Sequence, residues 1–85
     1  MKYICVLHED GFEEIIVFPR TINHDCMAEV AGGIKNKIHG NWQRVRREVI
    51  SAGFVTSSLQ CIGASVSLGI KSREEDTSLL KKQFQ

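Results

Sequence analysis

The stretch from Glu48 to Ile70 constrains the fold most, because it contains two apolar runs separated by a polar cluster. The first run is rich in the β-branched and aromatic residues that suit a pleated sheet, namely Val49, Ile50, Phe54 and Val55. The polar cluster Thr56–Ser58 can turn the chain. We therefore expect two adjacent antiparallel strands here, which the other elements cover or extend.

The second run, from Cys61 to Ile70, alternates between two kinds of residue, as is typical of a strand. One face would be apolar, with Ile62, Ala64, Val66, Leu68 and Ile70. The other face would carry small residues, among them Gly63, Ser65 and Ser67, which let another surface approach the backbone closely. Packing of the chain's own helix is the simpler interpretation of this face, and an interface with a partner or ligand is the alternative.

An N-terminal β-hairpin is predicted by the run Lys2–Leu7, the turn at Asp10 and Gly11, and the run Glu14–Phe18. Asp-Gly favours a tight turn because glycine adopts positive φ without a Cβ clash. Pro19 should end the second strand, since proline has no N–H to donate to the ladder.

A short helix over His24–Ala31 is expected next, with Asn23 as its N-cap, and it should falter at Gly32 and Gly33. The segment Lys35–Gly40 is expected to be a loop. Asn41–Arg47 would then be the outer part of a long third strand or a connection to it.

A C-terminal helix is predicted from Arg73 to about Gln83, where Ser72 and Glu75 have the spacing of a capping box. Its apolar stripe would comprise Leu79, Leu80 and Phe84. The expected fold is therefore α+β, with the order ββαββα, a small antiparallel sheet of about four strands and the helices packed on one face.

A chain of 85 residues is expected to form a single domain, residues 1–85. No apolar run has the length of about 20 residues that a membrane helix needs, and the N-terminus lacks the pattern of a signal peptide, so we expect a cytoplasmic protein without membrane contacts. The thin core of so small a domain makes a homodimer plausible.

The residues that carry chemistry do not form a catalytic or metal-binding pattern. Cys5, Cys26 and Cys61 are widely spaced, which supports neither a disulfide framework nor a zinc site. His24 and Cys26 could form a nucleophilic pair or bind a metal, but neighbours at a helix start lie in different directions. The acidic pair at residues 13–14 is explained by its position in a hairpin. The acidic run at residues 74–76 is explained by its position at the start of a helix. We therefore expect no enzyme, no metal and no cofactor.

A basic stretch without acids runs from Val30 to Arg47. It contains five of the eleven Lys and Arg residues, with a tryptophan between them: Lys35, Lys37, Trp42, Arg44, Arg46 and Arg47. Such residues can hold phosphates while the indole stacks on a base. A net charge of only +1 argues against a dedicated nucleic-acid binder, so a solvated charged face is the simpler interpretation.

The tract SAGFV, followed from Cys61 to Leu80 by C-x-G-x-S-x-S-L-G-I-x-S-R-x-E-D-T-x-L-L, resembles a group of small uncharacterised proteins encoded by bacteriophages and prophages. Phe18-Pro19-Arg20, Asn23-His24-Asp25 and Met27-Ala28-Glu29 are similar to that group as well. The group has Tyr, Arg and an acidic residue at the positions of Ile62, Ala64 and Val66, so a function of those polar groups is not expected here. The resemblance implies a phage origin and no particular activity.

Two functional hypotheses follow. By analogy with other small phage proteins, the chain would be a non-enzymatic protein that binds a host protein and inhibits or modulates it, a host defence system being one such target. Alternatively, the basic stretch 35–47 would bind a nucleic acid or a nucleotide anion.

Overall fold

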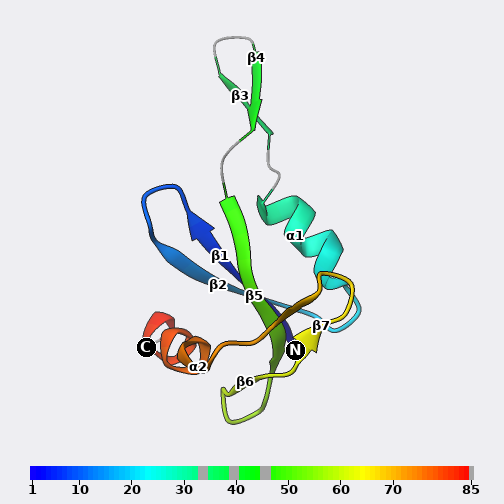
Figure 1. The fold of residues 1–85 in the computed structure, drawn as a ribbon, viewed down its shortest axis with the longest axis vertical. Helices are drawn as coiled ribbons and strands as arrows, with labels where there is room; N and C mark the ends of the chain where they lie inside the picture. Colours follow the sequence, from blue (N-terminus) through cyan, green and yellow to red (C-terminus); the bar gives the residue numbers. More distant parts are fainter. Residues whose placement is uncertain (33–34, 39–40, 45–46, 85) are drawn as a thin grey trace.

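The computed structural model describes residues 1–32, 35–38, 41–44 and 47–84, and it leaves the side chains of residues 29–47 outside the description (Figure 1). The elements in chain order are β1 Lys2–His8, β2 Glu13–Phe18, α1 His24–Gly32, β3 Lys35–Ile38, β4 Asn41–Arg44, β5 Arg47–Val55, β6 Cys61–Ile62, β7 Ala64–Ser65, β8 Ile70–Lys71 and α2 Glu74–Gln83. The predicted α+β class with an antiparallel sheet is confirmed. No helix in the described ranges combines the length and the apolar character needed to cross a membrane.

The main sheet has four antiparallel strands in the order β2-β1-β5-β6. The predicted N-terminal hairpin is confirmed: β1 pairs with β2 from Lys2↔Phe18 to Leu7↔Glu13, and Gly11 turns the chain with φ +91°. The long strand β5 pairs with β1 along its other side, with a shift of register between Cys5 and Val6. The central position of β1 therefore makes it the strand around which the sheet is built.

The two faces of β1 are covered by different helices. Tyr3 and Cys5 belong to one buried cluster together with Leu80 of α2, whereas Ile4 and Val6 belong to a second cluster against which Met27 of α1 packs. The helices therefore lie on opposite faces of the sheet (Figure 1), and the expectation that they share one face is wrong. The physical reason is that β1 is apolar on both faces, as in strands that are covered on both sides.

The predicted ten-residue strand from Cys61 to Ile70 is also wrong. The tract forms only β6, β7 and β8, of two residues each, and β7 turns back to pair with β8. Gly63 and Gly69 have φ values of +78° and +67°, so the backbone cannot remain extended through them. Burial is opposite to the expected pattern, because Ser65 is buried while Val66 is 97% exposed.

Both predicted helices are present, with differences at their ends. The hydrogen bond from Met27 N to Asn23 O places Asn23 at the start of α1, as expected. The box predicted for Ser72 and Glu75 lies one residue later, since Asp76 accepts the Arg73 N–H at 2.9 Å. Ser72 Oγ instead donates to Gly63 O at 2.9 Å. Phe84, expected in the apolar stripe, is 61% exposed.

The segment between α1 and β5 contains a two-stranded ribbon, β3 paired with β4. The expectation of a loop over Lys35–Gly40 is therefore wrong for residues 35–38. Asn41–Arg44 form the second strand of this ribbon rather than an extension of β5, while Arg47 begins β5.

We predict that Gly53→Ala destabilises the fold by about 2 kcal/mol, as overpacking does in well-packed sites. A Cβ at Gly53 of β5 would overlap the carbonyl oxygen of Ile62 and press on the Tyr3 ring, so β6 would have to move. Urea denaturation measures the loss, with the exposed Ser58→Ala as a control that should change little. Equal midpoints for Gly53→Ala and the wild type would contradict the close packing of β6 on β5.

Candidate functional site

A largely apolar groove, here named the end groove, lies where β2, β5, the β5–β6 turn and α2 meet. It has a volume of about 490 Å³ and is lined by Met1, Val17, Val55, Thr56, Ser57, Leu59, Leu80 and Phe84. A second hollow of about 330 Å³ adjoins it and is lined by Met1, Arg20, Phe54, Val55, Ile62 and Gly63. The two share Met1 and Val55, so together they form one extended surface.

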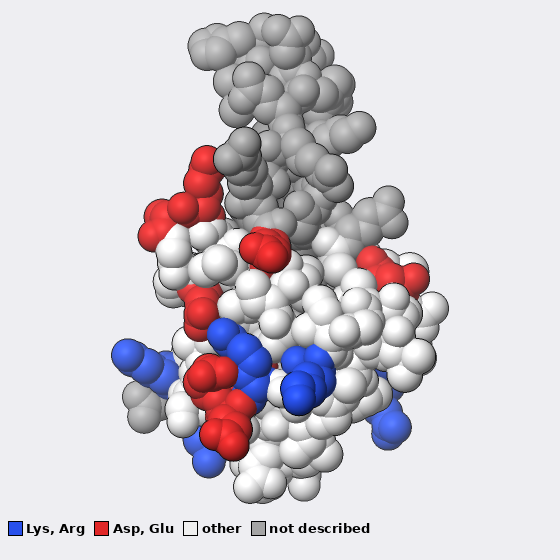
Figure 2. All heavy atoms as spheres, viewed as in Figure 1, with Lys and Arg blue, Asp and Glu red and all other residues white. Residues whose placement is uncertain are grey.

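Several large apolar side chains on this surface are exposed rather than buried in the core. Leu59 is 46%, Ile62 50%, Met1 55% and Phe84 61% exposed. In Figure 2 the end of the molecule formed by the β5–β6 turn is uncharged on the viewed face, and acidic and basic side chains lie above and beside it. Clustered exposed apolar groups of this kind are typical of sites that contact another molecule.

Leu59 occupies a backbone conformation that leucine rarely adopts. Its φ is +61°, and among the described residues no other residue except glycine has a positive φ. The turn is closed by hydrogen bonds from Thr56 N to Gln60 O at 2.9 Å and from Leu59 N to Thr56 O at 3.0 Å. Glycine or asparagine suits such a position better, because a Cβ there costs about 1–2 kcal/mol. Stability of the turn alone therefore does not explain the leucine.

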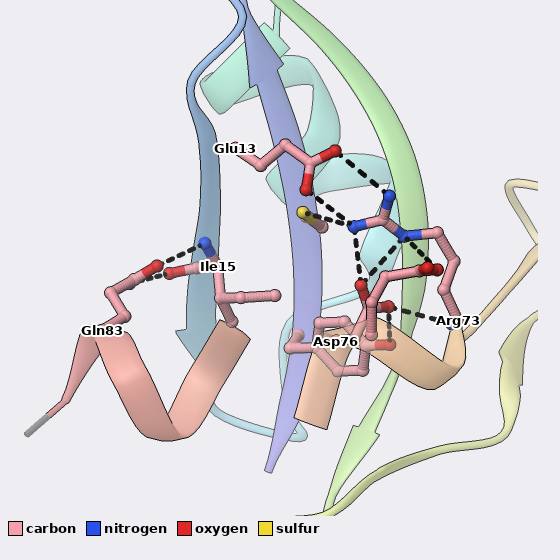
Figure 3. Close-up of polar contacts among 8 residues, drawn as sticks. Glu13, Ile15, Arg73, Asp76 and Gln83 are labelled. Atoms are coloured by element: carbon pink, nitrogen blue, oxygen red, sulfur yellow. Dashed lines mark hydrogen bonds and ion pairs between the residues drawn. The ribbon is translucent and has the colours of Figure 1, made fainter. Parts of the chain in front are cut away.

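A buried carboxylate fixes α2, which supplies one wall of the end groove (Figure 3). Asp76 is fully buried and accepts a 2.6 Å hydrogen bond from Tyr3 Oη. Its other oxygen is 2.8–2.9 Å from the Nη2 and Nε atoms of Arg73. Arg73 also reaches Glu13 of β2 at 3.2 and 3.3 Å. Figure 3 shows the guanidinium between the two carboxylates, and its Nη2 also lies 3.5 Å from Cys5 Sγ of β1, so one cation joins the start of α2 to the first two strands.

The environment of this cluster fixes its protonation state. Burial alone would raise the pKa of Asp76, but hydrogen bonds from Tyr3 and Arg73 outweigh it, and the pKa is lowered. Burial, reinforced by the bond to Asp76, raises the pKa of Tyr3. Burial also raises the pKa of Cys5 to about 11, although Arg73 opposes the change. Cys5 is therefore a thiol rather than a thiolate at neutral pH.

Ser51 also belongs to this buried region. Its hydroxyl is buried and makes no hydrogen bond of ordinary geometry. It nevertheless lies near enough to Asp76 and Cys5 to lower the pKa of both groups. Ser51 is therefore a weak dipolar neighbour of the carboxylate rather than one of its hydrogen-bonded partners.

The C-terminal turn of α2 is held by a second polar contact. The Gln83 amide donates to Ile15 O at 2.6 Å and accepts from Ile15 N at 2.8 Å, as the backbone of a neighbouring strand would (Figure 3). Earlier in the helix, Thr77 Oγ1 accepts the Cys61 N–H at 3.0 Å. These contacts position Leu80 and Phe84 at the end groove.

The small residues singled out in the sequence are not gathered on one exposed face. Gly63 borders the second hollow. Ser65 is buried, and its hydroxyl lies 3.2 Å from that of Ser67, which is exposed. Because the strand that would have aligned the three residues is broken, only Gly63 lies at the candidate surface.

His24 and Cys26 are not brought together as a reactive pair. His24 is 4% exposed, and its ring lies 5.5 Å from the rings of Phe18 and Phe54. Its Nε2 is 2.8 Å from Gly53 O, which requires the ring to donate that proton. Cys26 is exposed. The histidine therefore packs α1 onto the sheet.

Nowhere in the described part of the chain do three or more His, Cys, Asp or Glu side chains gather as metal ligands would.

Both acidic residues of β2, Glu13 and Glu14, have structural partners. Glu13 pairs with Arg73, and Glu14 Oε1 lies 2.9 Å from His8 Nε2.

Five residues of the basic stretch have their backbones in β3, β4 and β5, and their side chains are outside the description: Lys35, Lys37, Trp42, Arg44 and Arg47. Arg46 lies entirely outside the described residues.

Comparisons with protein-family models, with curated proteins and with solved structures find no significant match for this chain. The resemblance to phage proteins therefore stays a prediction, and the candidate site depends on its own geometry.

The residues that form the end groove were not recognised as a site from the sequence. Leu59 and Phe84 come from the turn and the helix end, and only tertiary packing brings both to the lining of one groove. One local signal was present: a leucine in a polar turn, Thr56-Ser57-Ser58-Leu59-Gln60, where the chain has to reverse. The charged cluster also has a signal in the sequence, because Arg73 and Asp76 have the i,i+3 spacing of an ion pair on a helix.

We predict that Asp76→Asn lowers the free energy of unfolding at neutral pH by about 3–5 kcal/mol, because it leaves Arg73 facing an amide instead of a carboxylate. The folded-state pKa of Asp76 lies below its unfolded value of about 3.9. Its stabilisation is thus complete above that value and is lost as pH falls through the folded-state pKa. Circular dichroism against pH measures both effects.

Glu75→Gln is the matched control for this prediction. Glu75 lies 3.5 Å from Arg73, but its side chain is 65% exposed, so its removal should cost at most about 0.5 kcal/mol. Wild-type acid sensitivity in Asp76→Asn would show that other carboxylates control unfolding below pH 4.

Proposed function

We propose that this chain is a non-catalytic protein-binding module whose end groove takes an apolar segment of a partner protein. The observation that carries the proposal is the end groove itself, which combines a volume of about 490 Å³ with exposed apolar walls. Its polar lining consists of the hydroxyl residues Thr56 and Ser57, with no side chain that is charged. Such a surface favours burial of apolar groups and offers no reactive centre.

The resemblance to phage and prophage proteins supports a bacterial host protein as the partner. In this proposal the chain acts in the host cytoplasm and inhibits or modulates that factor by covering part of its surface. A component of a host defence system fits this role. The unfavourable φ of Leu59 supports the same proposal, because backbone strain at an exposed position is often retained for function rather than for stability.

We predict that Leu59→Gly separates binding from folding. Glycine accepts the φ of +61° without strain, so the stability of the fold should stay equal or rise by up to about 1 kcal/mol. Removal of the leucine should nevertheless weaken partner binding by at least about tenfold, the scale of one buried apolar side chain. Affinity capture from bacterial lysate, followed by titration of the captured protein against each variant, measures this.

Two exposed phenylalanines provide a matched pair for the same measurement. Phe84→Ser changes the end groove, whereas Phe12→Ser changes a side chain of similar exposure in the β1–β2 turn, outside the groove. The proposal requires the first variant to lose the partner and the second to retain it. Equal retention by Leu59→Gly, Phe84→Ser and the wild type would eliminate the end groove as the binding site.

We further propose that two copies of the chain associate through the end groove when no other partner is present. Light scattering after size-exclusion chromatography should give twice the monomer mass for the wild type and the monomer mass for Leu59→Gly, since apolar burial drives the association. A dimer that persists in Leu59→Gly, or a wild-type monomer at every concentration, would contradict this.

A further inference from the structure

The pairing of β3 with β4 sorts the residues of the ribbon into two chemically different faces. Lys35 pairs with Arg44 and Lys37 with Trp42. Because cross-strand partners share a face and alternate residues of a strand share a face, all four lie together on one face. The other face holds Asn36, Ile38, Asn41 and Gln43. One face of the ribbon is therefore basic and the other is uncharged.

The stability of the ribbon does not explain this distribution. Like charges directly across an antiparallel pair are destabilising, and Lys35 is directly across from Arg44. No acid occurs between Glu29 and Glu48 in the sequence to offset the positive charge. A bound polyanion would offset the repulsion between these cations, because each of its phosphates would be attracted to a nearby Lys or Arg.

We propose that the basic face of the ribbon binds single-stranded nucleic acid. Lys35, Lys37 and Arg44 bind successive backbone phosphates, and Trp42 stacks on a base. Residues two apart on a strand are about 7 Å apart, and four residues extend over roughly 10 Å, so the site spans only a few nucleotides.

The presence of a tryptophan on the basic face favours single-stranded over duplex nucleic acid as the ligand. An indole stacks on a base only where that base is not already paired and stacked, as in single strands. By register Trp42 is on the same face as Lys35, Lys37 and Arg44, so in this proposal one strand uses both the stacking residue and the phosphate-binding residues.

This site is independent of the end groove. Figure 1 draws the ribbon beyond the end at which β5 begins, whereas the groove lies at the other end of β5, where the turn to β6 begins. Leu59→Gly should therefore leave oligonucleotide binding unchanged, so failure of one proposal is distinguishable from failure of the other.

The test uses the full chain and a short oligo(dT). Trp42 is the only tryptophan, so its fluorescence reports stacking directly, and quenching is expected on titration. Three phosphate contacts predict a slope of about −2 in log K against log salt, which is a loss of roughly 20-fold between about 50 and 200 mM salt.

Ribbon variants assign the binding to its face. The triple variant Lys35→Gln, Lys37→Gln, Arg44→Gln should abolish measurable binding even at about 50 mM salt. Trp42→Ala should weaken the binding of a labelled oligo(dT) by about tenfold with little change of slope. The control, Asn36→Ala with Gln43→Ala on the uncharged face, should bind as the wild type does.

Three results would overturn the proposal. The first is the absence of binding and of quenching at about 50 mM salt. The second is duplex DNA, polyglutamate or a nucleoside triphosphate binding as tightly as oligo(dT). The third is equal loss of affinity in the control and in the triple variant, which would show that the effect does not depend on the basic face.

Discussion

The buried carboxylate of Asp76 is the interaction on which the rest of this small structure depends. It joins distant parts of the chain, since Tyr3 is 73 residues away and the neighbouring guanidinium of Arg73, which Asp76 also binds, reaches Glu13 across 60 residues. A domain of this size buries little apolar surface, so breaking this buried ion cluster would remove a large part of its stability. Withdrawal of α2 would leave the buried Tyr3 hydroxyl without its acceptor and Glu13 without its cation, which ties helix and sheet into one cooperative unit.

With α2 fixed in this way, its side chains bind one backbone position on each edge strand of the sheet. Gln83 bonds to both backbone groups of Ile15 on β2, and Thr77 accepts the N–H of Cys61 on β6. Side chains thus occupy positions that further strands would otherwise fill, which protects exposed edges from pairing with other chains. The surface left open is instead the end groove, which offers side-chain contacts.

The two proposed binding surfaces rely on different physics. Association at the end groove comes from burial of apolar area, so its strength should depend little on salt. Association at the ribbon comes from release of counterions around phosphates, so its strength should fall steeply with salt. Each surface also carries a local cost that the fold does not require: a leucine at positive φ in the groove and a pair of facing cations in the ribbon.

The sequence by itself determined the elements whose causes are local: the N-terminal hairpin with its Asp-Gly turn, the short helix after Asn23, the strand leading to Val55 and the C-terminal helix. It also marked the basic stretch, but not the register that unites Lys35, Lys37, Trp42 and Arg44 on one face. Only the tertiary structure decided that Cys61–Ile70 breaks at Gly63 and Gly69, that the helices cover opposite faces, and that Leu59 and Phe84 line one groove. Turns, caps and helical periodicity depend on residues a few positions apart, whereas the placement of the helices and the groove depends on contacts between distant residues. The break in Cys61–Ile70 was missed for another reason: apolar and small residues alternate in the sequence whether or not a glycine turns the backbone.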